Sequence, residues 1–263
     1  MPLRQELRTL GGLDGTTRLM AAGTNLYRQG ESCAAYFIVL RGWISLSVLL
    51  DNGENQILDF ALPGSFLGFP LASTALTYHS ARCLTPVSVC SYPRRQLDNA
   101  IQRNPRLAFL LCQMASLDES RAHDHLVNVG LRSARERIAH LIVELYVRLR
   151  GDVPITTGEI ITIPLTQTQI GQAVGLTGVH VSRTLRTLRE QHIAQLTGSN
   201  LLILDPNALV RAAGMEPLSH CPSREYPDLR TKPTRPRPAT DAHSSYRIPT
   251  GWELPHGGAG TPI

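Results

Sequence analysis

The chain has 263 residues, of which 42% are hydrophobic, and its formal net charge is +5 at pH 7. This length predicts two domains, and the mild basic excess favours a polyanionic partner. The sequence contains neither a secretory signal nor a run of about 18 apolar residues, so we expect a cytoplasmic protein that does not contact a membrane.

Short apolar runs between evenly spaced glycines are the first pattern along the chain. Gly30, Gly42, Gly53 and Gly64 are 11 or 12 residues apart, and the runs between them are rich in Val, Ile, Leu and aromatic residues. Short strands punctuated in this way predict an all-β roll or sandwich. The glycines are interpreted as turn residues and not as ligands.

Two helices are predicted next, a short one over 94–104 and a long one from Pro105 to Gly130. Apolar side chains recur three and four residues apart along the long helix. That stripe could be buried against the roll of the same chain, against a second copy, or against both; it contains Leu107, Leu110, Leu111, Met114 and Leu117. A hinge is predicted between Val129 and Ser133.

His123, Asp124 and His125 resemble a metal-binding set, but the sequence predicts no metal site. Residues two apart on a helix point to nearly opposite sides. The three side chains are therefore interpreted as part of a solvated helix face.

Residues 165–190 predict two short helices that meet at a tight turn, and a further helix precedes them. Ser133 and Glu136 form a capping box for that preceding helix, and Thr166 begins the first of the pair. Gly175 suits the left-handed residue that ends the first helix of the pair, and Thr177 can cap the second. This is a helix-turn-helix arrangement.

The second helix of the pair has an apolar face and a basic one. Val181, Leu185 and Leu188 recur at helical spacing, whereas Val179, His180, Arg183 and Arg186 point away from them. Such side chains suit the DNA major groove. The alternative is an ordinary helical hairpin with a solvated basic face.

The sequence after this pair predicts a wing. Two apolar runs flank the turn Thr197–Asn200, Asp205-Pro206 begins a last short helix, and residues 155–166 predict another hairpin. Nine of the chain's 18 prolines lie in residues 215–263, which predicts a disordered tail.

Residues 165–204 resemble the DNA-binding domain of the Crp/Fnr superfamily of bacterial transcription regulators, above all in "GLTGVHVSRTLRTLRE". The resemblance extends over residues 20–214, where "LYRQGE", "YFIVLRGWISL" and "LPGSFLGF" are similar to the Fnr-like branch. It implies an α+β fold with three parts: a cyclic-nucleotide-binding-like β-roll that senses an effector (1–104), a dimerisation helix and hinge (105–131) and a winged helix-turn-helix (132–214). The Pro-rich tail (215–263) follows them.

The resemblance also implies partners and site residues. The expected partners are double-stranded DNA, a second copy of the chain and RNA polymerase. Arg183 would fork onto guanine, Ser182 would make a smaller base or phosphate contact, and Arg186 would hold phosphate. Val179 stands where the family commonly has Glu, so its methyls could meet a thymine methyl in place of the family's usual base contact, with His180 beside it. The predicted DNA-contacting residues are Thr177, Val179, His180, Ser182, Arg183 and Arg186. The predicted dimer residues are Leu107, Leu110, Leu111, Met114 and Leu117.

The family's ligand-binding pairs are absent from this sequence. Members that bind cAMP carry Gly-Glu and Arg-Ser or Arg-Thr, but the matching positions here are Gly68-Phe69 and His79-Ser80. No two of the five cysteines lie within four residues of each other, which argues against an iron–sulfur cluster; they are Cys33, Cys83, Cys90, Cys112 and Cys221. We expect buried thiols, with a redox role at Cys112 as a weaker hypothesis. No cofactor is predicted, and the effector site is unknown.

Two other functions are open at this point. The helical domain of a β-roll sensor could contact protein in place of DNA, or the β-roll could be an enzyme. The sequence contains no phosphate loop, metal spacing or nucleophile motif, so we predict that the chain is not an enzyme.

Overall fold

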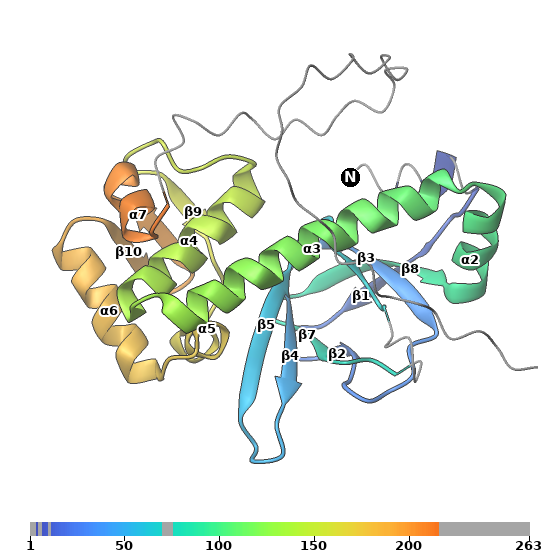
Figure 1. Ribbon diagram of the computed structural model, residues 1–263, viewed down its shortest axis with the longest axis horizontal. Coiled ribbons are helices and arrows are strands. Elements are labelled where there is room, and N and C mark those ends of the chain that lie inside the picture. The colour runs from blue at the N-terminus through green and yellow to red at the C-terminus, as the bar shows by residue number, and fades with distance from the viewer. Residues whose placement is uncertain (1–3, 5–6, 10–11, 70–75, 216–263) are drawn as a thin grey trace, which may run out of the picture. The chain divides into compact units, whose positions relative to one another are not determined.

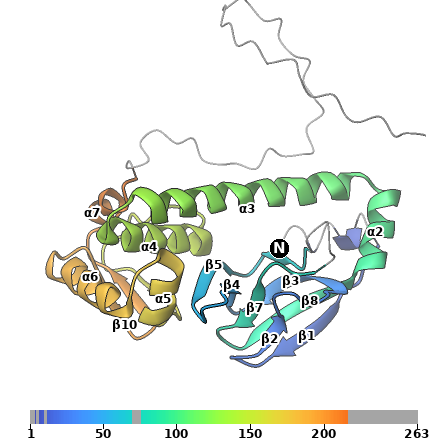
Figure 2. The same cartoon turned by 60° about the horizontal axis from the view of Figure 1, so that its bottom comes forward.

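The computed structural model describes residues 4, 7–9, 12–69 and 76–215. The tail that is predicted to be disordered lies outside the described residues, except for Met215, and so does Cys221. Figure 1 and Figure 2 show the arrangement of the described helices and strands.

Two four-stranded antiparallel sheets form the N-terminal roll, with strand orders β1-β8-β3-β6 and β2-β7-β4-β5. Apolar side chains of both sheets meet in one core, which includes Phe37, Ile44 and Val89. The predicted β-roll is therefore confirmed, and all four evenly spaced glycines have positive φ, as turn residues do. The strands are β1 Thr16–Met20, β2 Asn25–Tyr27, β3 Ala35–Arg41, β4 Ile44–Leu49, β5 Asn55–Ala61, β6 Phe66–Leu67, β7 Ser80–Cys83 and β8 Val87–Pro93.

Helix α2 (Arg94–Arg103) leads into the long helix α3 (Arg106–Leu131), which packs on the roll. Leu107 is fully buried there and Leu111 is only 8% exposed, in a cluster with Ile38, Tyr92 and Leu97. Leu110 and Met114 pack against the same cluster.

The roll of the same chain covers part of the predicted dimer stripe. Leu107 and Leu111 belong to the core of their own chain, Leu110 and Met114 lie at its edge, and Leu117 is half-buried. A contact between this stripe and a second copy stays a prediction. Helical periodicity shows that a stripe must be covered but does not show which surface covers it.

The α3 helix ends at Leu131 and α4 (Ala134–Arg150) follows, so the break between them falls at residues 132–133, within the predicted hinge. The predicted capping box is present. The backbone N–H of Ser133 donates to Glu136 Oε2 (2.7 Å), and the backbone N–H of Glu136 donates to Ser133 Oγ (3.4 Å). These bonds satisfy backbone donors that a helix start leaves free.

The C-terminal part is a winged helix-turn-helix, as predicted, and its small sheet has the order β10-β11-β9. The sequence predicted a hairpin over 155–166, but the structure has one strand there, β9, which pairs with β11. The elements after α4 are β9 Ile160–Thr162, α5 Gln167–Val174, α6 Gly178–Glu190, β10 Ala194–Thr197, β11 Asn200–Ile203 and α7 Pro206–Ala212.

The winged helix and the roll share apolar packing. Four apolar side chains of the roll, within or next to β4 and β5, belong to the same buried cluster as the apolar face of α4. They are Trp43, Ile57, Phe60 and Leu62. The rings of Trp43 and Phe60 meet edge to face with centroids 6.4 Å apart. Strand β5 also lies against α5, as both views show. The helix-turn-helix is therefore docked on one strand pair of the roll.

The crossing of α5 and α6 gives the first prediction. A Cβ atom at Gly171 would overlap the carbonyl oxygen of Leu176, which is backbone and cannot rotate away. We expect Gly171→Ala to lower the free energy of unfolding by about 1–3 kcal/mol, although alanine is the better helix former. Chemical denaturation measures this.

Gly178→Ala is the matched control, because a Cβ atom there meets nothing within 4 Å. It should be neutral or slightly stabilising. Equal effects of the two substitutions would contradict the close approach at Gly171.

Candidate nucleic-acid interface

Short-range hydrogen bonds set the angle between α5 and α6. Thr166 caps α5 in a capping box with Gln169, with donor–acceptor distances of 2.8 and 3.2 Å. Gly175 ends α5 in the left-handed conformation with φ of 66°, where other residues are strained. Thr177 then caps α6. All three sequence predictions are confirmed.

Helix α6 buries one face and leaves the other open. Val181 and Leu188 are fully buried, and Leu185 is partly buried against the same core. The six predicted DNA-contacting side chains are all exposed, with Val179 at 61%. The structure thus places Thr177, Val179, His180, Ser182, Arg183 and Arg186 at one accessible surface of one helix.

Two side chains on this surface have local partners. Thr177 Oγ1 accepts from the backbone N–H of His180 (3.3 Å) and lies 3.1 Å from its ring Nδ1. Arg186 pairs with Glu190 across one turn at 2.7 Å. The hydrogen bond from Arg186 to Glu190 and the negative charge of Glu190 raise the pKa of Arg186. The Arg186 side chain is therefore positively charged at every pH at which the protein is folded.

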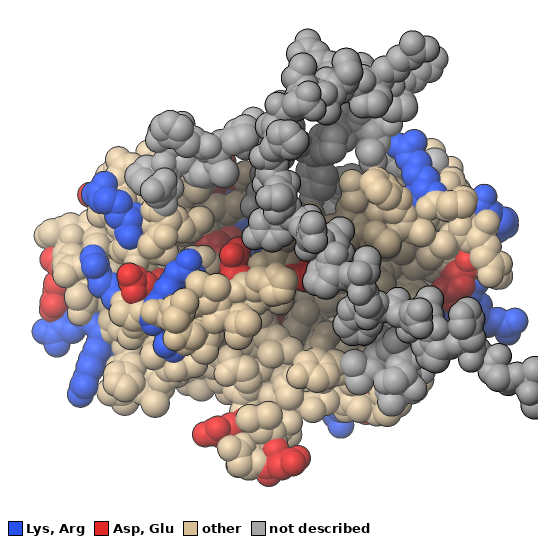
Figure 3. Space-filling model, in the orientation of Figure 1, with Lys and Arg blue, Asp and Glu red and all other residues tan. Residues whose placement is uncertain are grey.

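The surface carries positive charge. Arg183, Arg186 and Arg189 lie on α6 with a single carboxylate, Glu190. Figure 3 shows blue side chains over the part of the molecule where Figure 1 labels α6. A basic, exposed helix beside a wing is the kind of element that enters a major groove.

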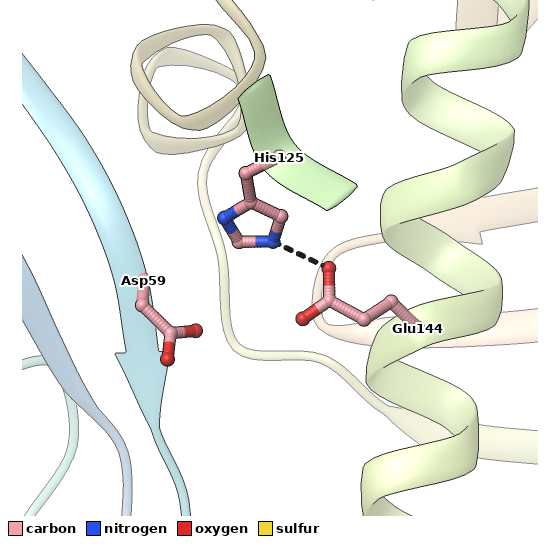
Figure 4. Close-up of side chains that lie close together, drawn as sticks. All are labelled: Asp59, His125 and Glu144. Carbon is pink, nitrogen blue, oxygen red and sulfur yellow. Dashed lines mark hydrogen bonds and ion pairs between the residues drawn. The ribbon is translucent and has the colours of Figure 1, made fainter. Parts of the chain in front are cut away.

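The sequence analysis missed a group of charged side chains at the junction of β5, α3 and α4. His123 is exposed, as predicted, but His125 is not on a solvated face, because its side chain is only 20% exposed. Its Nδ1 lies 2.9 Å from the carbonyl oxygen of Leu58 and its Nε2 lies 2.6 Å from Glu144 Oε2. Figure 4 shows both carboxylates, Asp59 and Glu144, beside the ring.

One signal could have placed His125 correctly. It follows the buried Leu107 by about five helical turns, so both side chains lie on the same face of α3. The donor atoms of Asp59, His125 and Glu144 lie within 4.8 Å of one another, a spacing that could hold a metal ion. Arg148 already contacts both carboxylates, at 2.6 and 3.1 Å.

Comparison with known proteins identifies the two halves. The family model described as "Cyclic nucleotide-binding domain" matches residues 17–104, and the one described as "Crp-like helix-turn-helix domain" matches residues 136–212. The nitrogen fixation regulation protein FixK of Rhizobium meliloti is 30% identical over 188 residues, which cover 71% of this chain and 82% of that protein. The chain belongs to the Crp/Fnr family.

Further relatives agree with this assignment. The transcriptional activator protein FnrA of Stutzerimonas stutzeri is 27% identical over 81% of this chain and 88% of its own length. The solved structure of FixK2 from Bradyrhizobium japonicum is 26% identical and has a TM-score of 0.68, covering 76% of this chain and 98% of that one. The CooA mutant from Carboxydothermus hydrogenoformans, at 16% identity and a TM-score of 0.61 over 76% of this chain and 88% of that one, shows the fold alone.

The protein is accordingly a DNA-binding transcription regulator of the Crp/Fnr type, with the α+β fold that the sequence predicted. The curated relatives named above, FixK and FnrA, have the names of regulators. None of the described helices combines the length and the apolar character that a membrane span requires.

The positions that match the cAMP-binding pairs of Crp/Fnr proteins hold no cation. His79 Nε2 bonds with the hydroxyl of Tyr27 (3.0 Å), and burial lowers the pKa of His79, so the ring is neutral at pH 7. Phe69 packs edge to face on Tyr36 and Phe66, with centroids 5.6 and 5.2 Å away. A cyclic phosphate would find no charge-assisted partner at either position.

The four described cysteines are free thiols. Cys33, Cys83 and Cys90 are buried, as predicted, and burial raises the pKa of Cys83. Cys112 is exposed on α3.

The second prediction concerns cAMP. Millimolar cAMP should leave the affinity of the protein for DNA unchanged, because Phe69 and His79 replace the carboxylate and the guanidinium that would bind it. Calorimetry measures binding directly, with a cAMP-binding Crp/Fnr protein as the positive control. Tight, saturable cAMP binding would contradict the placement of these two residues.

Proposed function

We propose that the protein is a homodimer that binds an inverted-repeat DNA site through α6, under the control of an effector other than cAMP. The observation that supports this most strongly is the set of six exposed side chains on α6, above a buried apolar face. The proposed parts are residues 1–104 for sensing, 105–131 for dimerisation and 132–214 for DNA binding. A DNA-binding regulator acts where the DNA is, so we place it in the cytoplasm.

Each side chain on α6 has a proposed role. The guanidinium of Arg183 donates two hydrogen bonds to guanine, at O6 and N7, and Ser182 beside it contacts a base or a phosphate. The Val179 methyls meet a thymine methyl, and His180 contacts a base edge or phosphate. Thr177, at the N-terminus of α6, lies where a helix favours phosphate.

Arg186 is proposed as a phosphate contact. Its ion pair with Glu190 is exposed, since both side chains are more than half accessible. Exposed pairs contribute little, so a phosphate can replace Glu190 at small cost.

The dimer contact is proposed on the outer face of α3. Phe109, Val127 and Leu131 are 55%, 45% and 84% exposed, and they lie on the side of the helix away from Leu107. Leu126 beside them is 72% exposed. Figure 2 shows no other described helix or strand on that side of α3. A second copy would remove this apolar surface from water.

Relatives that are named transcriptional activators, such as FnrA of Stutzerimonas stutzeri, also suggest RNA polymerase as a partner. The alternative function is a sensor whose helical domain contacts protein. In that case α6 would not bind double-stranded DNA. Selection of bound sequences from random DNA, with and without cell metabolites, tests the proposed function. Recovery of no inverted repeat under any condition would contradict it.

The third prediction concerns assembly. Sedimentation should show a dimer at micromolar concentration, and Leu126→Glu combined with Leu131→Glu should shift it towards monomer, because charged side chains resist burial. Glu119→Gln, an exposed change on the same helix, is the control. A wild-type monomer at that concentration would rule out the two-half-site arrangement.

The fourth prediction separates base contacts from phosphate contacts. Arg183→Ala should reduce the free energy of DNA binding by about 1–3 kcal/mol and relax the base preference at one base pair per half-site. Arg186→Ala should weaken binding to all DNA sequences alike and make the affinity depend less steeply on salt concentration. Competition binding against a panel of single-base variants measures both. Unchanged sequence preference in Arg183→Ala would show that another element contacts the bases.

A further inference from the structure

The charged group at the junction of the roll and the winged helix joins three elements. Asp59 comes from β5, His125 from α3 and Glu144 with Arg148 from α4. Arg148 bonds to Asp59 Oδ1 (2.6 Å), to Glu144 Oε1 (3.1 Å) and to the carbonyl oxygen of Phe60. The guanidinium of Arg148 thus ties α4 to β5. His125 ties α3 to α4 through Glu144 (Figure 4) and to β5 through the carbonyl oxygen of Leu58.

The neighbours of His125 suit a proton better than a metal ion. Its two ring nitrogens face a carbonyl oxygen and a carboxylate oxygen, which are both acceptors, so an imidazolium satisfies both. The guanidinium of Arg148 already lies on both carboxylates and would repel a divalent ion. The ionisable groups around His125 are Asp59 on β5, Glu144, Arg148 and His140 on α4, and Asp118, Arg121, Asp124 and Arg132 on α3.

We propose that protonated His125, with Asp59, Glu144 and Arg148, forms an ionic latch that fixes α4 to α3 and β5 and thereby sets the position of α6 for two-half-site DNA binding. This rests on the proposed function, because it assigns α3 to the dimer contact and α6 to DNA. The latch does not cover the DNA-contacting surface, since all six side chains on α6 are exposed in the latched arrangement.

The latch can determine the position of α6 because α4 contacts α3 and β5 through the charged group and contacts α6 through the apolar core. Its apolar residues share one core with Val181 and Leu188 of α6, so α6 follows α4. The α3–α4 contact also includes a buried polar side chain, Asn128, whose amide donates to the carbonyl oxygen of Arg137 (3.3 Å). His140 is buried with no partner for its Nδ1 among the described residues. A polar, incompletely satisfied contact is easier to open than an apolar one.

The state of His125 gives the latch a pH dependence. Burial lowers the pKa of His125, but the hydrogen bond and charge of Glu144, the charge of Asp59 and the carbonyl of Leu58 together outweigh it and raise the pKa to about 9. In the unfolded chain the value is about 6.5. The stabilisation is therefore complete below about pH 6.5 and is lost as the pH rises through about 9. Burial lowers the pKa of His140, so His140 loses its proton at a lower pH than His125 does.

The fifth prediction tests the latch with His125→Gln, which keeps a hydrogen-bonding side chain but removes the charge. Two probes are used: the duplex recovered by selection, and the same duplex with one half scrambled. At pH 7 the variant should bind the intact duplex about fivefold or more weakly, which is within the usual range of coupling between sites. Its affinity for the half-scrambled duplex should change less than about twofold, since α6 itself is intact.

The pH profile gives a second readout. Between pH 7 and pH 9.5 wild-type protein should lose its preference for the intact over the half-scrambled duplex, and His125→Gln should show no such loss. His123→Gln, two residues earlier on the same helix and exposed, is the control and should behave as wild type. An unchanged or increased preference for the intact duplex in His125→Gln would overturn the latch.

Failure of the latch can be told apart from failure of the proposed function. Wild-type protein that binds no duplex in a salt-dependent way would overturn the proposed function and the latch with it. Normal wild-type binding with an unaffected His125→Gln would overturn the latch alone.

A direct titration covers the case in which His125→Gln does not fold. The ring signals of His125 in wild-type protein, followed by NMR, should titrate well above pH 7, and a midpoint at or below about pH 6.5 would overturn the proposal. So would one zinc ion bound per chain and lost in Asp59→Asn, because a metal would then occupy the place of the proton.

Discussion

Burial of the apolar face of α4 is the contact on which the rest of the structure depends. Ile138, Ile142 and Leu145 lie in one cluster with the buried residues of α6 and with Trp43 and Phe60 of the roll. A helix surrounded in this way is buried over most of its circumference. The roll and the winged helix are therefore not independent bodies joined by a tether, because their side chains pack in the same core.

Most of the winged helix could be predicted because its signals are local. The capping residues Thr166, Gly175 and Thr177 affect only backbone groups within a few residues. The local sequence alone therefore specifies where α5 ends and where α6 begins. The exposed face of α6 follows directly once Val181 and Leu188 are buried. The same holds for the roll glycines, whose turns are local features.

What could not be predicted depends on contacts between distant segments. The stripe from Leu107 to Leu117 has the same spacing whether the roll or a second chain covers it, and the structure shows that the roll covers most of it. The group around His125 brings together residues 59, 125 and 144, and no local sequence pattern predicts that these three side chains lie close together. One of the two strands expected over 155–166 is absent for a similar reason, since pairing with β11 selects only Ile160–Thr162.

The contact between Thr177 and His180 has a consequence for the thermodynamics of DNA binding. A free histidine on a helix surface samples several rotamers, and fixing such a side chain in an interface costs about 0.5–1.5 kcal/mol. The threonine hydroxyl 3.1 Å from the ring already restricts that freedom in the unbound protein. Part of the entropy loss that fixing His180 in an interface would bring has thus occurred during folding, because one exposed side chain of α6 is already oriented in the unbound protein.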